Sequence, residues 1–422
     1  MEYTTSEAKE RVILIGVATD SEESTARSLS ELKELAKTAG AETLGTCIQV
    51  RDRQDPGTYI GSGKILEVAA MIAELGATGI ICDDELSPAQ LRNLEDALNT
   101  KVMDRTMVIL DIFAGRANSK EGKVQVEMAQ LKYRMTRLSG FGKDMSRLGG
   151  GIGTRGPGEK KLETDRRIIR NQISRLSKEL KEMQGHRDVT RKQRSRNSEI
   201  VAAIVGYTNA GKSTLLNYLT DAQVLSEDEL FATLDPTTRA LTLPNGEKIL
   251  LTDTVGFIDK LPHNLIEAFK STLEEAKYAD ILVHVVDASN PDYLHQMEVV
   301  YSTLKELGVE GKKIVTLFNK CDQVRLLSEP PVLRDFHADE CCEISALSGE
   351  NVEEFLHVLE QFIKEQRIDI ELVIPYPKTG LLQLLRAGGQ LISEDYREDG
   401  IALKASVANE VYQKVLAELK KN

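Results

Sequence analysis

The sequence predicts an α/β protein of four parts, and three observations lead to this prediction. Short apolar runs alternate with helical patterns over residues 1–110 and again over 199–365. Two narrow apolar stripes with helical spacing lie between them, over 111–198, and flank a glycine-rich stretch. Residues 366–422 combine strand and helix patterns. We therefore expect an N-terminal parallel α/β domain, an antiparallel helical hairpin, a second α/β domain and a small C-terminal α+β domain.

The composition indicates several ordinary cores and one basic segment. Of 422 residues, 41% are hydrophobic, and the formal net charge is −12. The charge is uneven, because residues 116–196 hold 22 Lys and Arg against 9 Asp and Glu. No apolar run is long enough to span a bilayer, and residues 1–10 lack the layout of a signal peptide. We therefore expect a cytoplasmic protein with at most a peripheral membrane contact. The five cysteines show no C-x-x-C spacing, which favours buried thiols over a metal site or a disulfide framework.

Residues 1–110 alternate between strand and helix patterns. We expect strands at 11–17, 43–50, 79–84 and 101–110 and helices at 24–38, 63–75 and 88–98. That order predicts a parallel sheet with helical crossovers. The stretch GSGK at 61–64 is similar to part of a phosphate loop, but no strand leads directly into it and no Ser or Thr follows Lys64. A turn that opens a helix is the favoured interpretation, and whether this domain binds ATP stays open.

Residues 111–198 change to a helical period. Apolar residues recur mostly every three or four positions over 124–138 and again over 162–183. Each stripe is narrow and needs a partner, which predicts an antiparallel hairpin with the intervening loop at its tip. The polar, basic stretch 185–198 is expected to be a linker to the next domain.

The loop between the two predicted helices is SGFGKDMSRLGGGIGTRGPGEKK, residues 139–161. It has eight glycines and five Lys or Arg against two acids. Because such a chain loses much backbone entropy on folding and has few side chains to bury, we expect an anionic partner to order it. A ring at Phe141 can stack on an unpaired base. The candidate RNA contacts are Phe141, Lys143, Arg147, Arg155, Lys160 and Lys161.

The hairpin has a second interpretation, as a dimerising coiled coil. Such a coiled coil needs complementary charges at its e and g positions, whereas an RNA-binding rod needs an excess of Lys and Arg. The basic excess over 116–196 favours RNA, and we expect a monomer.

Residues 199–214 carry a phosphate loop. The apolar run EIVAAIV leads into GYTNAGKS at 206–213 and then into the helical pattern TLLNYL, which is the strand, loop and helix that the motif G-x-x-x-x-G-K-[ST] requires. We expect the Lys212 ammonium to neutralise the β- and γ-phosphates and the Ser213 hydroxyl to bind Mg²⁺. The candidate nucleotide contacts here are Gly206, Tyr207, Thr208, Asn209, Ala210, Gly211, Lys212, Ser213 and Thr214.

Two further motifs belong on the phosphate side. The strand pattern ILLTDTVG places Asp253 to bind Mg²⁺ and the Gly256 N–H to sense the γ-phosphate. The segment FATLDPTTR, 231–239, is expected to supply a threonine that closes over Mg²⁺, with Thr233 as first choice and Thr237 as the alternative. The candidate contacts from these motifs are Phe231, Ala232, Thr233, Leu234, Asp235, Asp253, Thr254, Val255 and Gly256.

Residues 313–347 carry the motifs that select the base. A carboxylate at Asp322 can accept from both N1–H and N2–H of guanine, and adenine offers no such pair of donors. GTP is therefore favoured over ATP. The candidate base-side contacts are Asn319, Lys320, Cys321, Asp322, Ser345, Ala346 and Leu347. These motifs in this order, each at a strand end, predict a Ras-like P-loop GTPase domain.

Taken together, the motifs resemble those of one family. GYTNAGKST, FATLDPTTR, DTVGFI, NKCD and SAL are similar to the HflX branch of the translation-factor-related GTPases, and the resemblance extends through YIGSGK and GGGIGTRGPGE to cover residues 11 to about 364. It implies Mg²⁺-dependent hydrolysis of GTP to GDP and binding to ribosomal RNA of the large ribosomal subunit. It also implies separation of stalled or idle ribosomes into subunits, with the glycine-rich loop near the peptidyl-transferase region.

Two positions bear on the rate of hydrolysis. Phe257 follows DTVG where many GTPases carry a glutamine that orients the attacking water, so we expect slow hydrolysis by the isolated protein. Asn209 is similar in placement to the asparagine of potassium-activated GTPases, which makes K⁺ a candidate cofactor beside Mg²⁺. The candidate catalytic residues are Lys212, Asn209, Thr233 and Gly256.

Residues 366–422 predict a strand, a helix, a hairpin and a final helix. Their acidic character does not suggest RNA contact. An accessory domain packed on the GTPase domain is favoured over an independent binding site.

Overall fold

The computed structural model describes residues 9–138, 157–196, 200–220, 230–262, 265, 275–326, 330–365, 367–387 and 389–420. The chain divides into two compact units. The first contains Met1–Glu182, Glu227–Asp235 and Asp259–Lys270, and the second contains Met183–Ser226, Pro236–Ile258 and Ser271–Asn422. Within the described ranges, no helix combines the length and the apolar character that crossing a membrane requires.

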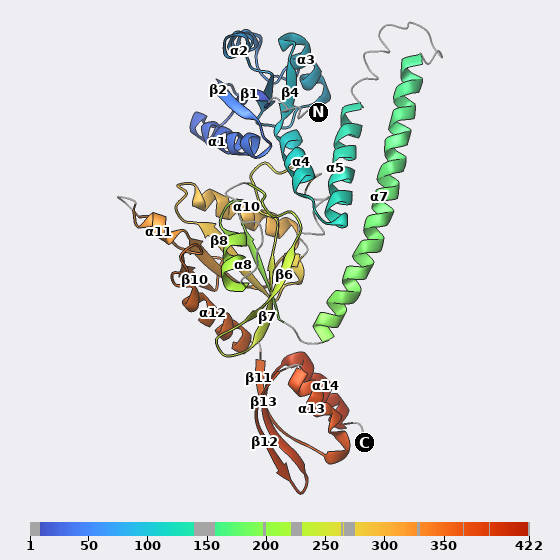
Figure 1. Cartoon of the computed structure of the whole chain (residues 1–422), viewed down its shortest axis with the longest axis vertical. Coiled ribbons are helices and arrows are strands. Elements are labelled where there is room, and N and C mark those ends of the chain that lie inside the picture. Colours follow the sequence, from blue (N-terminus) through green and yellow to red (C-terminus); the bar gives the residue numbers. More distant parts are fainter. Residues whose placement is uncertain are drawn as a thin grey trace, which may run out of the picture. The chain divides into compact units, whose positions relative to one another are not determined.

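The first unit contains the expected parallel sheet (Figure 1). Its strands run in the order β2-β1-β3-β4, all parallel. Strand β1 is buried on both faces, which explains its continuous apolar sequence. Ile13 and Ile15 pack with α2 and α3, whereas Leu29 of α1 lies against Gly16 on the other face. The elements are β1 (Arg11–Ala18), α1 (Glu22–Thr38), β2 (Glu42–Val50), α2 (Ser62–Leu75), β3 (Gly79–Cys82), α3 (Pro88–Leu98) and β4 (Lys101–Asp104).

The expected strand at 101–110 is wrong beyond its fourth residue. Strand β4 ends at Asp104, and helix α4 (Arg105–Arg116) begins at once. The Asp104 carboxylate accepts a 2.9 Å hydrogen bond from the Met107 N–H, which caps the helix. The prediction failed because α4 is buried along much of its length. A buried helix and a buried strand both appear in a sequence as a continuous apolar run.

The stretch GSGK opens helix α2, as the favoured interpretation predicts. The Gly61 N–H donates a 2.8 Å hydrogen bond to Oε1 of Gln49, and Lys64 forms a 2.8 Å ion pair with Glu67. Both groups that could meet a phosphate therefore have partners within the domain.

Helices α5 (Lys120–Leu138) and α7 (Pro157–Arg196) form the expected antiparallel pair over the part of α7 in the first unit (Figure 1). Lys120, at the start of α5, lies 2.8 Å from Glu179, and Arg166 donates a 3.1 Å hydrogen bond to the carbonyl of Leu138 at the end of α5. Leu176 of α7 is 2% exposed. The predicted tip lies largely in residues 139–156, outside the described residues.

The expected linker at 185–198 is wrong, because α7 continues through Arg196. Its C-terminal stretch lacks an apolar stripe, which is the signal that the sequence argument used. Lys, Arg and Gln are nevertheless good helix formers, and a single Gly185 costs only about 1 kcal/mol.

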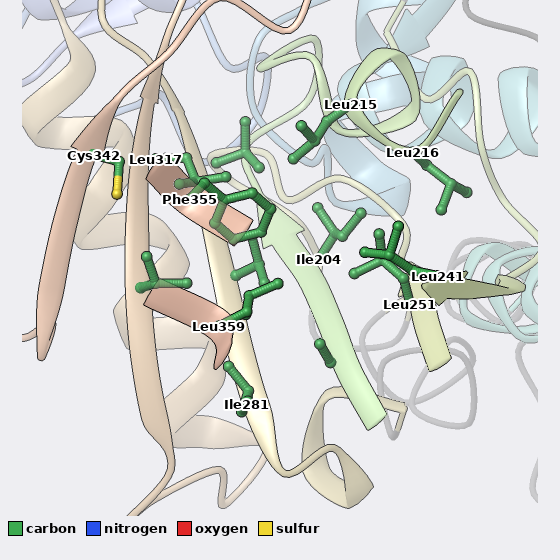
Figure 2. Packing of buried hydrophobic residues seen from close by; sticks show 14 of the residues in the cluster. Ile204, Leu215, Leu216, Leu241, Leu251, Ile281, Leu317, Cys342, Phe355 and Leu359 are labelled. Atoms are coloured by element: carbon green, nitrogen blue, oxygen red, sulfur yellow. The ribbon is translucent and has the colours of Figure 1, made fainter. Parts of the chain in front are cut away.

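The second unit contains a sheet in the order β10-β9-β8-β5-β7-β6, parallel except for β6. Helices α8 and α12 cover one face, where Leu215 and Leu216 of α8 and Phe355 of α12 join the strand residues in one core cluster (Figure 2). Helix α10 covers the other face through Met297. The strands are β5 (Val201–Gly206), β6 (Thr237–Thr242), β7 (Lys248–Asp253), β8 (Ile281–Asp287), β9 (Lys313–Asn319) and β10 (Glu340–Glu343), and the helices are α8 (Lys212–Thr220), α10 (Tyr293–Glu306), α11 (Cys321–Val324) and α12 (Val352–Glu365).

The C-terminal part has the predicted strand, helix, hairpin and helix. Its antiparallel sheet has the order β11-β13-β12, and one face is covered by α13 and α14 through Leu385 and Val415. The elements are β11 (Arg367–Ile374), a 3₁₀ turn (Tyr376–Lys378), α13 (Gly380–Ala387), β12 (Gly389–Arg397), β13 (Gly400–Ala408) and α14 (Asn409–Lys420).

Candidate nucleotide site

The phosphate loop joins β5 to α8 at the carboxyl edge of the parallel strands. Gly211 has φ +97, and a Cβ on it would collide with Nδ2 of Asn319, so only glycine fits between this loop and β9. The loop then enters the first turn of α8, where main-chain N–H groups and the helix dipole favour an anion. This backbone is suited to hold a phosphate chain.

Lys212 is the buried cation of the loop. Its side chain is 6% exposed, and Nζ donates a 2.7 Å hydrogen bond to the Tyr207 carbonyl. Burial lowers the pKa of this ammonium to about 8, against the opposing effect of the Asp253 carboxylate. A phosphate placed beside Nζ would favour the charged form, so we expect anion binding and lysine protonation to reinforce each other.

Ser213 and Asp253 meet at a position suited to a divalent cation. The Ser213 hydroxyl donates a 2.7 Å hydrogen bond to Oδ2 of Asp253, and Asp253 is fully buried at the end of β7. A hydroxyl and a carboxylate are hard oxygen donors, which Mg²⁺ prefers, and Mg²⁺ in nucleotide sites takes its other ligands from phosphates and water. These two residues therefore fit the expected metal.

The DTVG segment lies directly against the phosphate loop. Phe257 N–H donates to the Gly206 carbonyl at 3.1 Å, and Thr208 N–H donates to the Phe257 carbonyl at 2.8 Å. The hydroxyl of Thr254 donates a 2.7 Å hydrogen bond to the Ile204 carbonyl. A Cβ on Gly256 would lie 2.9 Å from both Nζ of Lys212 and Cα of Thr208. Any movement of Gly256 would therefore displace the phosphate loop or the Lys212 side chain.

Phe257 cannot orient a water molecule at the phosphates. Its side chain is 1% exposed and its main chain is the part that contacts the loop. Slow hydrolysis by the isolated chain stays a prediction.

Asn319 joins the base-side motifs to the phosphate loop. Its Nδ2 donates a 2.8 Å hydrogen bond to the Ala210 carbonyl, and its Oδ1 accepts a 2.8 Å hydrogen bond from the Ala346 N–H. Ser345 is buried, whereas the side chain of Leu347 is 80% exposed. Asp322 sits on the short helix α11 with its side chain partly accessible. The structure therefore brings the predicted phosphate and base motifs of the second unit together.

The comparisons with known proteins agree with this geometry. Three family models match in order, described as GTP-binding GTPase N-terminal over residues 26–114, GTP-binding GTPase Middle Region over 116–194 and 50S ribosome-binding GTPase over 201–320. The GTPase HflX of Lacrimispora saccharolytica is 60% identical over 406 residues, which cover 96% of this chain and 95% of that protein. The chain belongs to the HflX family of GTPases.

More distant relatives extend the comparison. The GTPase HflX of Escherichia coli is 39% identical over 88% of this chain and 87% of its own length. A solved GTP-binding protein from the archaeon Sulfolobus solfataricus, in complex with GDP, is 25% identical, covers 84% of this chain and 99% of its own, and superposes with a TM-score of 0.43.

The predicted switch threonines of this HflX-family chain lie in different surroundings. Thr237 opens β6 and pairs with Asp253 in the antiparallel ladder of the second unit. Thr233 lies just before Asp235, in a segment that belongs to the first unit. The choice of Thr233 over Thr237 as a metal ligand stays a prediction.

Asp287 also lies at the carboxyl edge of the sheet, although its sequence motif was not among those predicted. This residue ends β8, and its Oδ2 lies 2.7 Å from Nζ of Lys320, the lysine of the NKCD motif. Lys320 has φ +64, so its backbone is held in an unusual conformation beside the base-side loop. A signal was present, because Asp287 ends the apolar run ILVHVV at the same edge of the sheet as the other motifs.

The expected RNA contacts are the least described part of the chain. Phe141, Lys143, Arg147 and Arg155 lie outside the described residues. Lys160 and Lys161 fall in the first turns of α7.

Proposed function

We propose that this HflX-family GTPase binds the large ribosomal subunit and, in its GTP-bound state, separates stalled or idle ribosomes into subunits. The observation that carries the proposal is the antiparallel pairing of α5 with α7, supported by the contacts Lys120–Glu179 and Arg166–Leu138. This pairing joins the two helices through the glycine-rich stretch at one end of the hairpin. A basic rod with such a tip suits a surface of folded RNA.

The same pairing argues against the dimerising coiled coil. In a dimerising helix the narrow apolar stripe stays available for a second chain, whereas Leu176 and Leu180 of α7 are already buried within the chain. We therefore keep the expectation of a monomer that acts on ribosomes in the cytoplasm.

For GTP hydrolysis, we propose that each of the following residues of the second unit contacts a different part of the nucleotide or its metal. Lys212 would hold the β- and γ-phosphates, and Ser213 and Asp253, which already lie together, would hold Mg²⁺, whose charge would offset that of the same phosphates. The Gly256 N–H would donate a hydrogen bond to the γ-phosphate, and the Asp322 carboxylate would accept hydrogen bonds from guanine. Because Phe257 is buried and its side chain has no polar group to orient a water molecule, we expect slow hydrolysis until the ribosome orders the site.

A loop replacement tests the ribosomal role. We expect that replacing residues 141–157 with a short neutral linker leaves nucleotide affinity and basal hydrolysis within a few fold, because the phosphate loop, Asp253 and Asp322 lie in the second unit, outside the replaced residues. Co-sedimentation with large subunits should weaken with a shallower salt dependence, and subunit splitting should stop.

A matched variant separates charge from shape. Lys143→Gln, Arg147→Gln and Arg155→Gln together keep every glycine and remove three charges, so their effect should fall mainly on the salt slope of binding. If the chain with the neutral linker still separates ribosomes at the original rate, the loop only connects two helices and the proposal is wrong.

A further inference from the structure

Two segments that flank the nucleotide motifs in the sequence pack into the first unit. Residues 230–235 precede β6, and residues 259–262 follow DTVGFI, yet both belong with the N-terminal sheet and the helical pair.

The first segment is held at Asp235 by the start of helix α5. Oδ2 of Asp235 accepts hydrogen bonds from the N–H groups of Asn118 at 3.0 Å and Ser119 at 2.7 Å, and the Ser119 hydroxyl bonds to Oδ1. The Ser119 hydroxyl also accepts from Gly122 N–H at 2.9 Å, which makes it the cap of α5. A carboxylate at a helix N-terminus is favoured by the free N–H groups and by the helix dipole.

Phe231 supplies an apolar anchor four residues before Asp235. It is 2% exposed, and its ring packs edge-on against Phe113 of α4 with 4.7 Å between centroids. Edge-to-face aromatic pairs add about 0.5–1.5 kcal/mol beyond the buried area. The predicted sensor threonine, Thr233, therefore lies between two fixed points.

The second segment is held at Lys260 by two carboxylates of the N-terminal sheet. Asp83 and Asp84 follow β3 at the carboxyl edge of the parallel strands. Nζ of Lys260 lies 3.0 Å from Oδ1 of Asp84 and also forms an ion pair with Asp83. Burial would lower the pKa of this lysine, but the two carboxylates outweigh it and raise the pKa. The carboxyl edge of such a sheet is where open α/β folds bind ligands, and here a side chain of the same protein occupies it.

Thr233 and Gly256 are the groups that we assign to sensing Mg²⁺ and the γ-phosphate, and each lies within or just before a docked segment. In GTPases the γ-phosphate and Mg²⁺ hold such switch segments at the nucleotide, and hydrolysis releases them. Docking on the first unit and contact with the nucleotide therefore compete for the same short segments.

We propose that Asp83, Asp84, Phe113 and the N-terminus of α5 form a docking surface for the chain's own nucleotide-sensing segments, 230–235 and 259–262. Docking stabilises the state without GTP, and GTP binding releases the segments from this surface. Because coupling between two sites is reciprocal, whatever frees the surface raises the affinity for GTP. The inference rests on the proposed roles of Thr233 and Gly256 and does not depend on ribosome splitting.

A double-mutant cycle without ribosomes tests the lysine anchor. We expect that Lys260→Met and Asp84→Asn each raise the affinity for a non-hydrolysable GTP analogue relative to GDP by about fivefold or more. In the double variant, the increase in relative affinity for the analogue should be only slightly larger than in the more affected single variant. Both substitutions remove the same interaction, between Lys260 and Asp84. Lys277→Met and Asp395→Asn, at exposed positions outside both docked segments, are the matched controls.

The other anchor is tested independently. Ser119→Gly keeps a helix cap of nearly the same strength and removes the hydroxyl that bonds Asp235. It should therefore also raise the affinity for the GTP analogue relative to GDP. In the unmodified chain, amide hydrogen exchange at Asn118 and Ser119 should accelerate when the analogue replaces GDP, because these N–H groups lose their acceptor. Thermal unfolding of each variant separates a folding defect from a shift in nucleotide preference.

Three results would overturn the proposal. One is an analogue-to-GDP ratio unchanged within about twofold in both Lys260→Met and Ser119→Gly, and another is a ratio that falls. The third is unchanged exchange at Asn118 and Ser119 between the two nucleotide states. None of these results depends on whether the chain binds ribosomes, so they leave the ribosomal proposal to its own test.

Discussion

The Ser213 hydroxyl donates a 2.7 Å hydrogen bond to the Asp253 carboxylate, at the meeting point of the phosphate loop and β7. Each residue thus holds the other in place at the position that we assign to Mg²⁺. The contact has a measurable consequence.

We expect Ser213→Ala to remove most of the Mg²⁺ dependence of GTP affinity. The unmodified chain should bind GTP at least about tenfold more tightly with Mg²⁺ than with a chelator, because the metal links protein oxygens to phosphate oxygens. In the variant the two affinities should converge. Ser302→Ala on the exposed face of α10 is the control, and a full Mg²⁺ effect in Ser213→Ala would contradict the assignment.

Asp322→Asn should change the base preference. The asparagine side chain replaces one acceptor by a donor, which opposes the N–H groups of guanine and suits the 2-oxygen of xanthine. Competition binding with GTP and XTP measures the shift, with Asp395→Asn as the control. Undiminished GTP affinity would show that another group reads the base.

Gly256→Ala should impair hydrolysis without unfolding the chain. The added Cβ would lie 2.9 Å from Nζ of Lys212 and from Cα of Thr208, so either the lysine or the loop must move. We expect a loss of at least about tenfold in the single-turnover hydrolysis rate, since one tenfold step corresponds to only 1.4 kcal/mol. Gly63→Ala, whose Cβ would meet nothing within 4 Å, should be silent. Equal rates in the two variants would mean that the packing around Gly256 is unimportant.

Asn209 should confer a preference for K⁺ over Na⁺. It holds φ +60 in the phosphate loop, a conformation that asparagine tolerates and glycine adopts freely. Asn209→Gly therefore keeps the backbone and removes the side chain. We expect faster hydrolysis in K⁺ than in Na⁺ for the unmodified chain and no difference for the variant. Equal rates in the two salts for the unmodified chain, with and without ribosomes, would exclude a potassium role.

Stability should fall on acidification because of a buried network in the second unit. His284 is fully buried, and burial lowers its pKa below the ordinary 6.5 despite the nearby Asp335 carboxylate. Burial would raise the pKa of Asp335, but the His284 ring, with its Nδ1 3.7 Å from Oδ2, and hydrogen bonds from Thr316 and Tyr301 outweigh it and hold the pKa well below 3.8. As pH falls through about 6.5, the unfolded chain binds a proton at His284 that the folded chain resists, and Asp335 acts in the same sense below about pH 4.

Urea unfolding at pH 7.5 and 5.5 measures the histidine contribution. His284→Gln should be less stable at pH 7.5 but should lose less stability between the two pH values, by up to about 1 kcal/mol. His357→Gln, at an exposed position, is the control. An unchanged difference between the two pH values in His284→Gln would assign the acid sensitivity to other groups.

The sequence by itself determined the nucleotide motifs and the parallel α/β character of the regions around them. Each motif ends an apolar strand, and the carboxyl ends of parallel strands share one edge, so local spacing was enough to predict that Ser213, Asp253 and Asn319 lie together. The family follows from the same residues, because GYTNAGKS and NKCD are contiguous in the chain. The C-terminal strand, helix, hairpin and helix were likewise visible as local patterns.

The tertiary structure decided what depends on contacts between distant residues. A buried helix and a buried strand share the same apolar run, so only packing showed that the chain turns helical at Arg105. The bridge from Asn319 to Ala210 spans 109 positions, and the bond from Ser119 to Asp235 spans 116. No local period encodes such pairs, because hydrogen bonds and ion pairs depend on where the folded backbone brings the side chains.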